Sequence, residues 1–386
     1  MEPVQAALWV VILLVVLALL FDFMNGFHDA ANSIATIVST RVLKPQQAVV
    51  WAAAFNFLAY FLFQLKVAST IGKGTIDPAI VDYYVVFGAL IGAIIWNIIT
   101  WYYGIPSSSS HALVGGLVGA AVAKAGFGGL ISAGVLKIIA FIFVAPFLGF
   151  VIGGLLMVIV SWICRNMAPR KVDKHFRRFQ LISAAAYSLG HGGNDAQKTV
   201  GIIWMILIAA GLSTTESEIP GWVVLACYTA MGLGTMFGGW RIVKTMGNRI
   251  TKLNQPRGFS ANSGGAFTLF IASAFGIPVS TTHTITGAIA GVGTTRGTKQ
   301  VRWGVAGGIV WAWILTIPCS AIMAAGPQPP VSFNWTAPIC SAWPSGWGCG
   351  CRRGGRSAGG RSSAVRPSRP SRHEPSRAAG RHSRGR

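Results

Sequence analysis

Long apolar segments separated by short polar ones make up most of this chain. The apolar segments cover approximately residues 5–38, 47–65, 79–103, 131–163, 179–212, 220–238, 263–275 and 301–325. Several of them reach the roughly 20 residues that a helix needs to cross the hydrocarbon core of a bilayer. The pattern therefore predicts an all-α polytopic membrane protein.

Two polar segments interrupt this pattern and are similar to each other. Residues 25–33 read Asn-Gly-Phe-His-Asp-Ala-Ala-Asn-Ser, and residues 191–199 read His-Gly-Gly-Asn-Asp-Ala-Gln-Lys-Thr, so that they align on Asp29 and Asp195. Their glycines allow the backbone to leave helical geometry, and we expect broken helices at both places. Paired interruptions in a duplicated chain are typical of secondary transporters.

A second pair of motifs follows in the same order. Residues 104–111 read Gly-Ile-Pro-Ser-Ser-Ser-Ser-His, and residues 276–283 read Gly-Ile-Pro-Val-Ser-Thr-Thr-His. Each leads into a shorter Gly/Ala-rich segment, 107–125 or 278–295. Proline is favoured in the first turn of a helix and hydroxyl residues at its N-cap. We predict two re-entrant helical hairpins; the alternative is two ordinary spans with a small-residue packing face.

Charged loops predict the orientation of the chain. The loops 165–178 and 241–257 are rich in Lys and Arg, which indicates that both are cytoplasmic, and the acidic segment 213–218 between them is then external. The two halves would enter the membrane from opposite sides, as an inverted repeat. With residues 131–163 as a single span, the chain has one crossing too few to place 165–178 in the cytoplasm. Either these residues, which contain Pro146, form two short spans, or another crossing precedes them.

These features divide the chain into four parts. They are the first transmembrane repeat (1–164), a basic cytoplasmic loop (165–178), the second transmembrane repeat (179–325) and an Arg/Gly/Pro/Ser-rich tail (326–386). The tail has almost no aliphatic residues and is expected to be disordered. A basic tail attracts anionic lipid or nucleic acid, but the composition fits a dispensable C-terminus better, so we expect no nucleic-acid partner.

The composition supports this division. The chain has 386 residues, of which 52% are hydrophobic and only 11% charged, whereas soluble domains have about 25% charged residues. Its net charge is +22, and 11 arginines against one glutamate follow residue 326, so about half of the excess lies in the tail. We expect a multi-pass protein of the cell membrane, with the lipid bilayer as its surroundings.

Aspartates inside apolar segments are the first candidates for chemistry. Asp22, Asp29 and Asp195 are of this kind, and a charged side chain at the centre of a membrane helix costs roughly 2.5–3.5 kcal/mol. Asp29 and Asp195 are at equivalent positions, so the fold should bring them together near the midplane. Facing carboxylates repel unless cations or protons intervene. We predict that both bind coupling ions; the alternative is that each caps a broken helix.

Amide side chains accompany these aspartates. Asn25, Asn32, Asn194 and Gln197 offer oxygen atoms to a hard cation and N–H groups to an anion. We assign Asn25 and Gln197 to the coupling ion, and Asn32 and Asn194 to a substrate anion. Lys198 either pairs with an aspartate or attracts the anion.

Two hydroxyl clusters are candidates for an anion site. They are Ser108, Ser109 and Ser110 in the first half, and Ser280, Thr281 and Thr282 in the second. Each lies at a predicted helix N-terminus, where backbone N–H groups and the helix dipole favour an oxyanion. Two such clusters facing each other would hold one tetrahedral anion; the alternative is helix capping alone. Four histidines lie close by, and they either pack by hydrogen bonds or take part in proton coupling; they are His28, His111, His191 and His283.

Other classes of function find less support. No nucleophile–base pair and no metal-ligand spacing stand out, so we expect no enzyme, no catalytic residue, no resident metal and no cofactor. A channel would need a continuous polar pore, and these apolar helices with paired polar interruptions do not provide one.

The motifs resemble the inorganic phosphate transporter (PiT) family, in particular its bacterial low-affinity branch. The resemblance lies in residues 27–33, residues 191–199 and the two Gly-Ile-Pro motifs, and it covers residues 1 to about 325. It implies an inverted-repeat fold that binds phosphate and coupling cations between the repeats. By position, the resemblance makes Asp29, Asn32, Asn194 and Asp195 the paired acidic-motif residues, and it places residues 108–110 and 280–282 around phosphate at the hairpin tips.

The resemblance also implies a secondary active transporter that imports inorganic phosphate by cation symport and alternating access. Bacterial relatives are generally proton symporters that accept phosphate complexed with a divalent metal such as Mg²⁺. His28 stands where the broader family often has Asn, which leaves Na⁺ open as the coupling ion. Sulfate or another oxyanion is the alternative substrate, but Asp29 or Asp195 could accept a hydrogen bond from protonated phosphate, which favours phosphate. A homodimer is left open.

Overall fold

The structure is a computed structural model that describes residues 8–326, which belong to one compact unit, Met1–Phe333. The tail predicted to be disordered lies outside the described residues, apart from Gly326. The α-helices are α1 (Leu8–Ser39), α2 (Pro45–Leu58), α3 (Lys66–Gly74), α4 (Tyr83–Tyr103), α5 (Ser109–Ala125), α6 (Ser132–Ile163), α7 (Pro169–Ala209), α8 (Gly221–Phe237), α9 (Trp240–Asn248), α10 (Gln255–Ala274), α11 (Thr281–Thr294) and α12 (Trp303–Ala325). Short 3₁₀ turns are η1 (Ala59–Phe61), η2 (Pro78–Ile80), η3 (Phe127–Gly129) and η4 (Thr298–Gln300).

Helices account for the regular structure of the described residues, apart from an isolated β-bridge between Ile76 and Leu130. By length and composition, α1, α4, α6 and α12 are able to cross a membrane. Two bent pairs, α2 with α3 at 79° and α8 with α9 at 73°, raise the number of candidate spans to six. The predicted all-α polytopic class, with broken helices, is confirmed.

The breaks, however, are not where the glycines of the polar segments predicted them. Both α1 and α7 run through residues 25–33 and 191–199 without interruption. A Cβ atom on Gly26 would lie 2.2 Å from the backbone oxygen of Met231 in α8, and one on Gly192 would lie 2.3 Å from that of Asn56 in α2. These glycines therefore allow two helix backbones to approach closely, and the helical hydrogen bonds are kept.

The segments 107–125 and 278–295, predicted as hairpins, each contain a single helix, α5 or α11. Each hairpin is formed with the helix before the Gly-Ile-Pro motif as its first limb. In the first hairpin α4 packs against α5, and in the second α10 packs against α11. Gly104 and Gly276 end the first limbs with φ of 65° and 64°, a conformation that favours glycine. Ser108 and Ser280 cap the second limbs, since their hydroxyls accept from the backbone N–H groups of residues 111 and 283.

The first hairpin opens at the end of the molecule where α7 ends. At its open end, Asp82 and Lys124 form an ion pair at 2.6 Å. The Tyr83 hydroxyl there donates to the backbone oxygen of Ala209, the last residue of α7.

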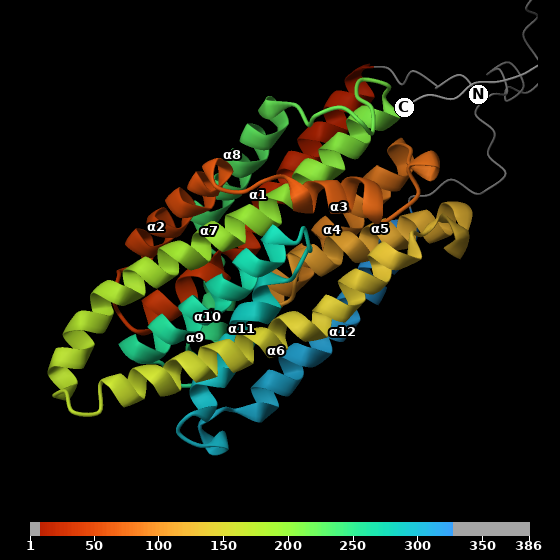
Figure 1. Ribbon diagram of the computed structural model, residues 1–386. Helices are drawn as coiled ribbons and strands as arrows, with labels where there is room; N and C mark the ends of the chain where they lie inside the picture. Colours follow the sequence, from red (N-terminus) through yellow and green to blue (C-terminus); the bar gives the residue numbers. More distant parts are fainter. Residues whose placement is uncertain (1–7, 327–386) are drawn as a thin grey trace, which may run out of the picture. The chain divides into compact units, whose positions relative to one another are not determined.

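The second hairpin opens at the opposite end, where α7 begins (Figure 1). Gln255, the first residue of α10, donates from Nε2 to the backbone oxygen of Thr40 at 3.3 Å. The Thr40 hydroxyl in turn donates to Oε1 of Gln180 near the start of α7. Because a helix rises about 1.5 Å per residue, residues 180 and 209 of α7 lie roughly 40 Å apart, so the two hairpins open at opposite ends.

This arrangement corrects the count of crossings. Residues 132–163 form one continuous helix, α6, although Pro146 lies inside it, so the two short spans considered for them do not exist. The crossing that was missing from the count is supplied by α5, because α4 and α5 form a hairpin and α5 returns the chain to the end at which α4 began. The basic segment 165–178 was predicted as a loop, but α7 begins at Pro169 and contains most of it. This segment and the first turn after α1 share one end, where Arg177 donates to the backbone oxygen of Arg41 at 3.0 Å.

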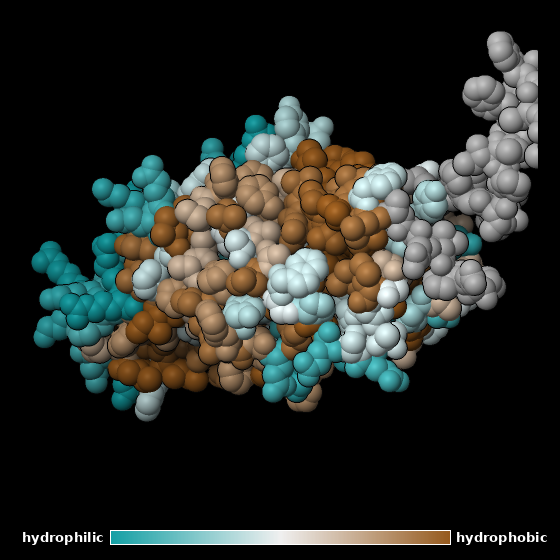
Figure 2. Space-filling view, turned by 90° about the horizontal axis from the view of Figure 1, so that it is seen from above, coloured by the Kyte–Doolittle hydropathy of each residue, from teal (hydrophilic) through white to brown (hydrophobic). Residues whose placement is uncertain are grey.

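The surface agrees with a membrane-embedded arrangement. Figure 2 shows hydrophilic residues gathered at one end, on the left, where Figure 1 places the loop between α6 and α7, and hydrophobic residues covering the middle. The helix α6 has exposed apolar side chains along its length, among them Phe143, Phe147 and Trp162. An exposed apolar band of this kind fits contact with lipid.

The core consists of two hydrophobic clusters with a polar layer between them. In α1 the first cluster ends at Phe21 and the second begins at Ala31. In α7 the second cluster includes Tyr187 and the first begins again at Ala196. The buried polar residues of both helices therefore lie where the clusters meet.

Candidate functional site

The two repeated aspartates meet in the interior. A carboxylate oxygen of Asp29, one of Asp195 and a ring nitrogen of His191 all lie within 4.8 Å of one another. Each of these residues is at most 2% exposed. The prediction that the fold brings Asp29 and Asp195 together is confirmed in its geometry. Two carboxylates and an imidazole are ligands that could hold a small cation.

Each aspartate contacts the hairpin of its own half. The Ser109 hydroxyl donates to Oδ1 of Asp29 at 3.2 Å. In the second half, the Thr281 hydroxyl donates to Oδ2 of Asp195 at 2.9 Å. These hydroxyls belong to the first residue of α5 and of α11, so the N-termini of both helices point at the carboxylate pair.

The residue three positions after each aspartate contacts the hairpin of the other half. Asn32 donates from Nδ2 to the Thr282 hydroxyl at 2.9 Å, and Lys198 donates from Nζ to the Ser110 hydroxyl at 2.6 Å. The two halves thus make corresponding contacts with exchanged partners. A pseudo-two-fold relation between the halves would produce this pattern.

Lys198 is paired with an aspartate. Its Nζ donates to Oδ1 of Asp195, and it also donates to the backbone oxygen of Val279 at 2.6 Å. The side chain is buried. Of the two roles that the sequence left open, the structure shows ion pairing.

Asp29 has a different environment. Its Oδ1 atom lies 2.6 Å from Nδ1 of His28, and Nε2 of His28 lies 3.1 Å from the Thr100 hydroxyl. Its Oδ2 atom is buried without a hydrogen-bond partner among the described residues. Of the two repeated aspartates, Asp29 is therefore the one with a free acceptor atom.

Two of the predicted site residues serve the scaffold instead of the carboxylate pair. The Gln197 carbonyl accepts from the backbone N–H groups of Val67 and Ala68, at 3.1 and 3.4 Å, in the first turn of α3. Asn194 holds the second hairpin, since it donates to the Ser273 hydroxyl and to the backbone oxygen of Ile277 at 3.1 Å each. Neither side chain makes a hydrogen bond to either aspartate among the contacts of residues 8–326.

The remaining predicted residues divide in the same way. Ser108 and Ser280 accept from backbone N–H groups as N-caps, which is the capping role considered for the clusters. Asn25 lies one helical turn before Asp29, and its Oδ1 is buried without a partner in the described chain. Asp22, which has no acidic counterpart, accepts from the Thr199 hydroxyl at 2.9 Å.

The sequence indicated His191 as one of the neighbouring histidines but not as a site residue, and it did not indicate Tyr187 at all. The Nε2 atom of His191 lies 3.3 Å from Oδ2 of Asp195, and its Nδ1 atom lies 3.2 Å from the side-chain oxygen Oδ1 of Asn56. The Tyr187 hydroxyl donates to the backbone oxygen of Thr281 at 2.9 Å. His191 opens the second polar segment, so its position was a usable signal, whereas Tyr187 precedes that segment and gave none.

Two histidines pack directly behind the hydroxyl clusters. The rings of His111 and His283 meet edge to face with centroids 4.4 Å apart, and His283 stacks on Trp313 at 3.7 Å. Both histidines are buried. This geometry joins the first turns of α5 and α11.

A short helix of the second half holds the tip of the first hairpin. The Thr245 hydroxyl of α9 donates to the backbone oxygen of Gly104 at 3.1 Å, and Arg241 donates to that of Tyr102 at 2.5 Å. Gly247, near the end of the same helix, packs on the backbone oxygen of Ala35. The helix α9 therefore lies between this tip and the end of the molecule where α1 ends.

A short helix of the first half holds the second hairpin in the corresponding way. The Thr70 hydroxyl of α3 donates to the backbone oxygen of Gly276 at 2.7 Å, and Lys66 donates to that of Ala274 at 3.1 Å. Lys73, in the last turn of α3, donates to the backbone oxygen of Thr215 in the acidic loop. The helix α3 therefore lies between the second tip and the opposite end.

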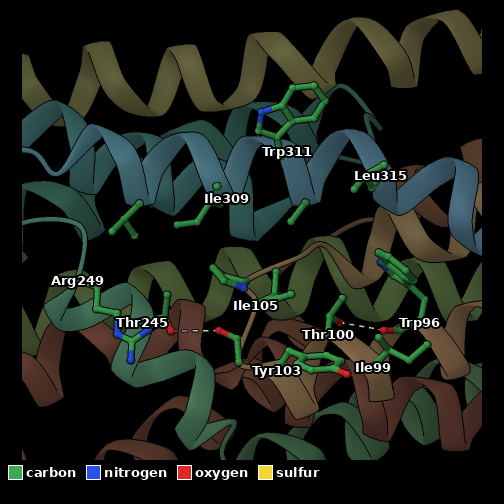
Figure 3. A pocket seen from close by; sticks show the side chains of 15 residues that line it. Trp96, Ile99, Thr100, Tyr103, Ile105, Thr245, Arg249, Ile309, Trp311 and Leu315 are labelled. Atoms are coloured by element: carbon green, nitrogen blue, oxygen red, sulfur yellow. Dashed lines mark hydrogen bonds between the residues drawn. The ribbon is translucent and has the colours of Figure 1, made fainter.

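A cavity of about 440 Å³ lies between α4, α9 and α12, on the outer side of the first hairpin tip. Figure 3 shows Ile309 and Leu315 of α12 on one side of it, and Thr100 and Tyr103 of α4 on the other. The tip residues Gly104 to Pro106 also line it, while Asp29 and Asp195 do not. The aspartates and the hydroxyl clusters are closed off from both ends in this conformation, since all are buried.

Comparisons with known proteins agree on one family. Residues 25–324 match the PHO4 phosphate transporter family. A probable low-affinity inorganic phosphate transporter of Rhizobium meliloti (strain 1021) is 60% identical over 312 residues, 81% of this chain and 93% of that protein. A protein of the same description from Bacillus subtilis (strain 168) is 49% identical over 316 residues, again 81% of this chain and 95% of that protein. A solved structure described as the sodium-dependent phosphate transporter superposes with a TM-score of 0.76 at 27% identity, covering 83% of this chain and 98% of that one.

Proposed function

Because the chain belongs to the PHO4 phosphate transporter family, we propose that it imports inorganic phosphate by cation symport with alternating access. It is a phosphate transporter and a multi-pass protein of the plasma membrane, and it is not an enzyme. The proposal is carried by one observation. Two buried carboxylates, one from each half, meet at the N-termini of two hairpin helices. This arrangement combines a cation position with donors for an oxyanion.

Phosphate suits the donors and acceptors of this centre. The hydroxyls of Ser109, Ser110, Thr281 and Thr282 and the helix N-termini behind them offer hydrogen bonds to the anion. Protonated phosphate also needs an acceptor, which Oδ2 of Asp29 supplies because it has no partner in the described chain. Asn32, which contacts Thr282, adds an amide donor. A fully deprotonated oxyanion such as sulfate would leave that acceptor unused.

The coupling ion in this proposal is a proton bound between His28 and Asp29. Their side chains lie 2.6 Å apart and are buried, so a proton there neutralises the carboxylate before the hairpins rearrange. A solved relative is described as sodium-dependent, and sodium is therefore the competing ion in the test.

Alternating access requires that the two ends open in turn. The clasps by which α9 holds the first hairpin tip and α3 holds the second face opposite ends of the molecule. We expect release of the α9 clasp to open the site toward the end that carries the basic segment 165–178, called here the basic end. Release of the α3 clasp should open the site toward the opposite end. The cavity beside Gly104 provides room into which the first tip can move.

Uptake into proteoliposomes tests the proposal as a whole. An inward proton gradient is expected to drive accumulation of labelled phosphate, while a sodium gradient at equal pH is not, and labelled sulfate is not taken up. A Mg²⁺ arm measures whether phosphate enters as a complex with a divalent metal. Symport would be ruled out if phosphate entered at the same rate with and without an imposed gradient and never accumulated above its outside concentration.

The clasps are tested separately with single cysteines. In a chain whose own cysteines are replaced by serine, Thr245→Val is expected to raise labelling of Ile105→Cys from the basic end about fivefold, because it removes a hydrogen bond worth roughly 1 kcal/mol. Thr70→Val is expected to do the same for Ile277→Cys from the opposite end. The measurement is labelling by an impermeant thiol reagent in oriented vesicles.

A matched control is Thr229→Val, since the Thr229 hydroxyl bonds only to the backbone oxygen of Leu225 in its own helix among the contacts of residues 8–326. It should leave both rates unchanged. Labelling that rises equally from the two ends would contradict the assignment of one clasp to each end.

A further inference from the structure

The ammonium group of Lys198 is surrounded by oxygen atoms of three kinds. It contacts a carboxylate oxygen of Asp195, the hydroxyl oxygen of Ser110 and the backbone oxygen of Val279. The residue is 1% exposed. Carboxylate, hydroxyl and carbonyl oxygens are also the ligands that hard metal cations take. Lys198 thus fills a position that would otherwise suit a small cation.

The corresponding position in the first half carries no charge. It is Asn32, three residues after Asp29 as Lys198 is three residues after Asp195. Asn32 donates to a hairpin hydroxyl, as Lys198 does, but it brings no charge to the carboxylate. The two aspartates are therefore unequal, because the ammonium of Lys198 neutralises Asp195 permanently while Asp29 keeps a free oxygen atom.

We propose that Lys198 is a resident cation that takes the place of one coupling ion, so that transport needs one mobile cation, at Asp29. This proposal rests on the cation symport proposed above. An uncompensated charge in the membrane interior costs several kcal/mol, so Asp29 must be neutralised in each cycle, whereas Asp195 need not be. Asp22 is also buried, and its Oδ2 has no partner among the described residues. It accepts from the Thr199 hydroxyl and lies outside the group that Asp29, Asp195 and His191 form, so the mobile cation of this proposal is the one at that group.

The variant Lys198→Asn tests this directly, because it puts into the second half the residue that the first half already has. The contact between Asn32 and Thr282 shows that an asparagine at this position reaches the hairpin hydroxyl. At Lys198→Asn the freed oxygen atoms of Asp195, Ser110 and Val279 should bind Na⁺. Phosphate uptake is expected to fall about tenfold or more in choline medium and to recover with added Na⁺, while wild-type uptake at fixed pH is independent of Na⁺.

The control is Lys198→Met, which has a similar volume and no oxygen atom. It should lose uptake in choline medium and gain nothing from Na⁺. Uptake by Lys198→Asn that does not depend on Na⁺, or wild-type uptake that rises with Na⁺ as much as that of the variant, would overturn the proposal.

Binding is read independently of transport by the melting temperature of the purified proteins. Na⁺ should raise the melting temperature of Lys198→Asn but not that of the wild type or of Lys198→Met, because a ligand stabilises the state that binds it. A folded Lys198→Asn that Na⁺ does not stabilise overturns the resident-cation proposal. Absence of gradient-driven uptake by the wild type would instead overturn the proposed symport, with the Na⁺ shift still deciding the role of Lys198.

If Lys198→Asn does not fold, the wild type decides. The ratio of cations to phosphate is obtained from the imposed cation gradient at which net phosphate flux reverses. A ratio of one supports the proposal, and a ratio of two contradicts it.

Discussion

Asp29→Asn is expected to reduce gradient-driven phosphate uptake about 100-fold while the protein still folds and reaches the membrane. Asparagine keeps the size of the side chain and an oxygen atom, but it cannot bind a proton or a cation by charge. Removing the charge that binds the cation should weaken cation binding by about 3 kcal/mol, which corresponds to a loss of two orders of magnitude in affinity. The measurement is accumulation of labelled phosphate in proteoliposomes at an equal amount of inserted protein.

The fold should tolerate Asp29→Asn because asparagine keeps an oxygen atom that can take the place of Oδ1, which contacts His28 and accepts from Ser109, and because Oδ2 has no hydrogen-bond partner in the described chain. Asp82→Asn is the matched control. Asp82 lies in the same half, but at the open end of the first hairpin, where its ion pair with Lys124 is partly exposed and worth at most about 1 kcal/mol. Asp82→Asn should keep its uptake, and unchanged uptake by Asp29→Asn would remove that carboxylate from the mechanism.

Asp195→Asn should act in a different way, by lowering stability as well as uptake. It leaves the ammonium of Lys198 buried without its carboxylate, and an unpaired charge of this kind costs about 3–5 kcal/mol. We expect a clear fall in melting temperature and in the yield of folded protein. Thermal unfolding of the purified protein in detergent measures it.

The double variant with Asp195→Asn and Lys198→Met separates the two effects. It contains neither charge, so most of the lost stability should return, while uptake stays reduced because Ser110 and the backbone oxygen of Val279 have lost the ammonium group that they contact. If Asp195→Asn alone were as stable as the wild type, the ion pair would not exist in the folded protein. Asp29→Asn serves here as the reference for a carboxylate without an ammonium partner.

The comparison of sequence and structure is most informative at Gly26 and Gly192. Both were predicted to break their helices, because glycine permits irregular backbone. Glycine also permits two helices to approach until backbone atoms touch, and the structure uses it for that purpose against α8 and α2. The two uses cannot be told apart in a sequence, because the neighbouring helix that decides between them is distant along the chain.

The hairpins illustrate the same limit. Their tips were predicted from Gly-Ile-Pro followed by hydroxyl residues, and Gly104 and Gly276 do end helices there. The role of α4 was not predictable, since its 21 residues suffice for a complete span. Its pairing with α5, stabilised at the open end by Asp82 and Lys124, makes it one limb of a hairpin. The division into inverted repeats remains a prediction, which the exchanged contacts of Asn32 and Lys198 support.

The sequence by itself determined the class of protein, the places of the hairpin tips and the equivalence of Asp29 with Asp195. Hydrophobic length and local turn chemistry act over a few residues, and a duplicated motif marks equivalent positions wherever they lie. Only the tertiary structure decided which carboxylate is neutralised by Lys198, which amides serve the scaffold, and which short helix holds which hairpin tip. Those outcomes depend on distances between atoms far apart along the chain, and the packing of helix on helix sets these distances.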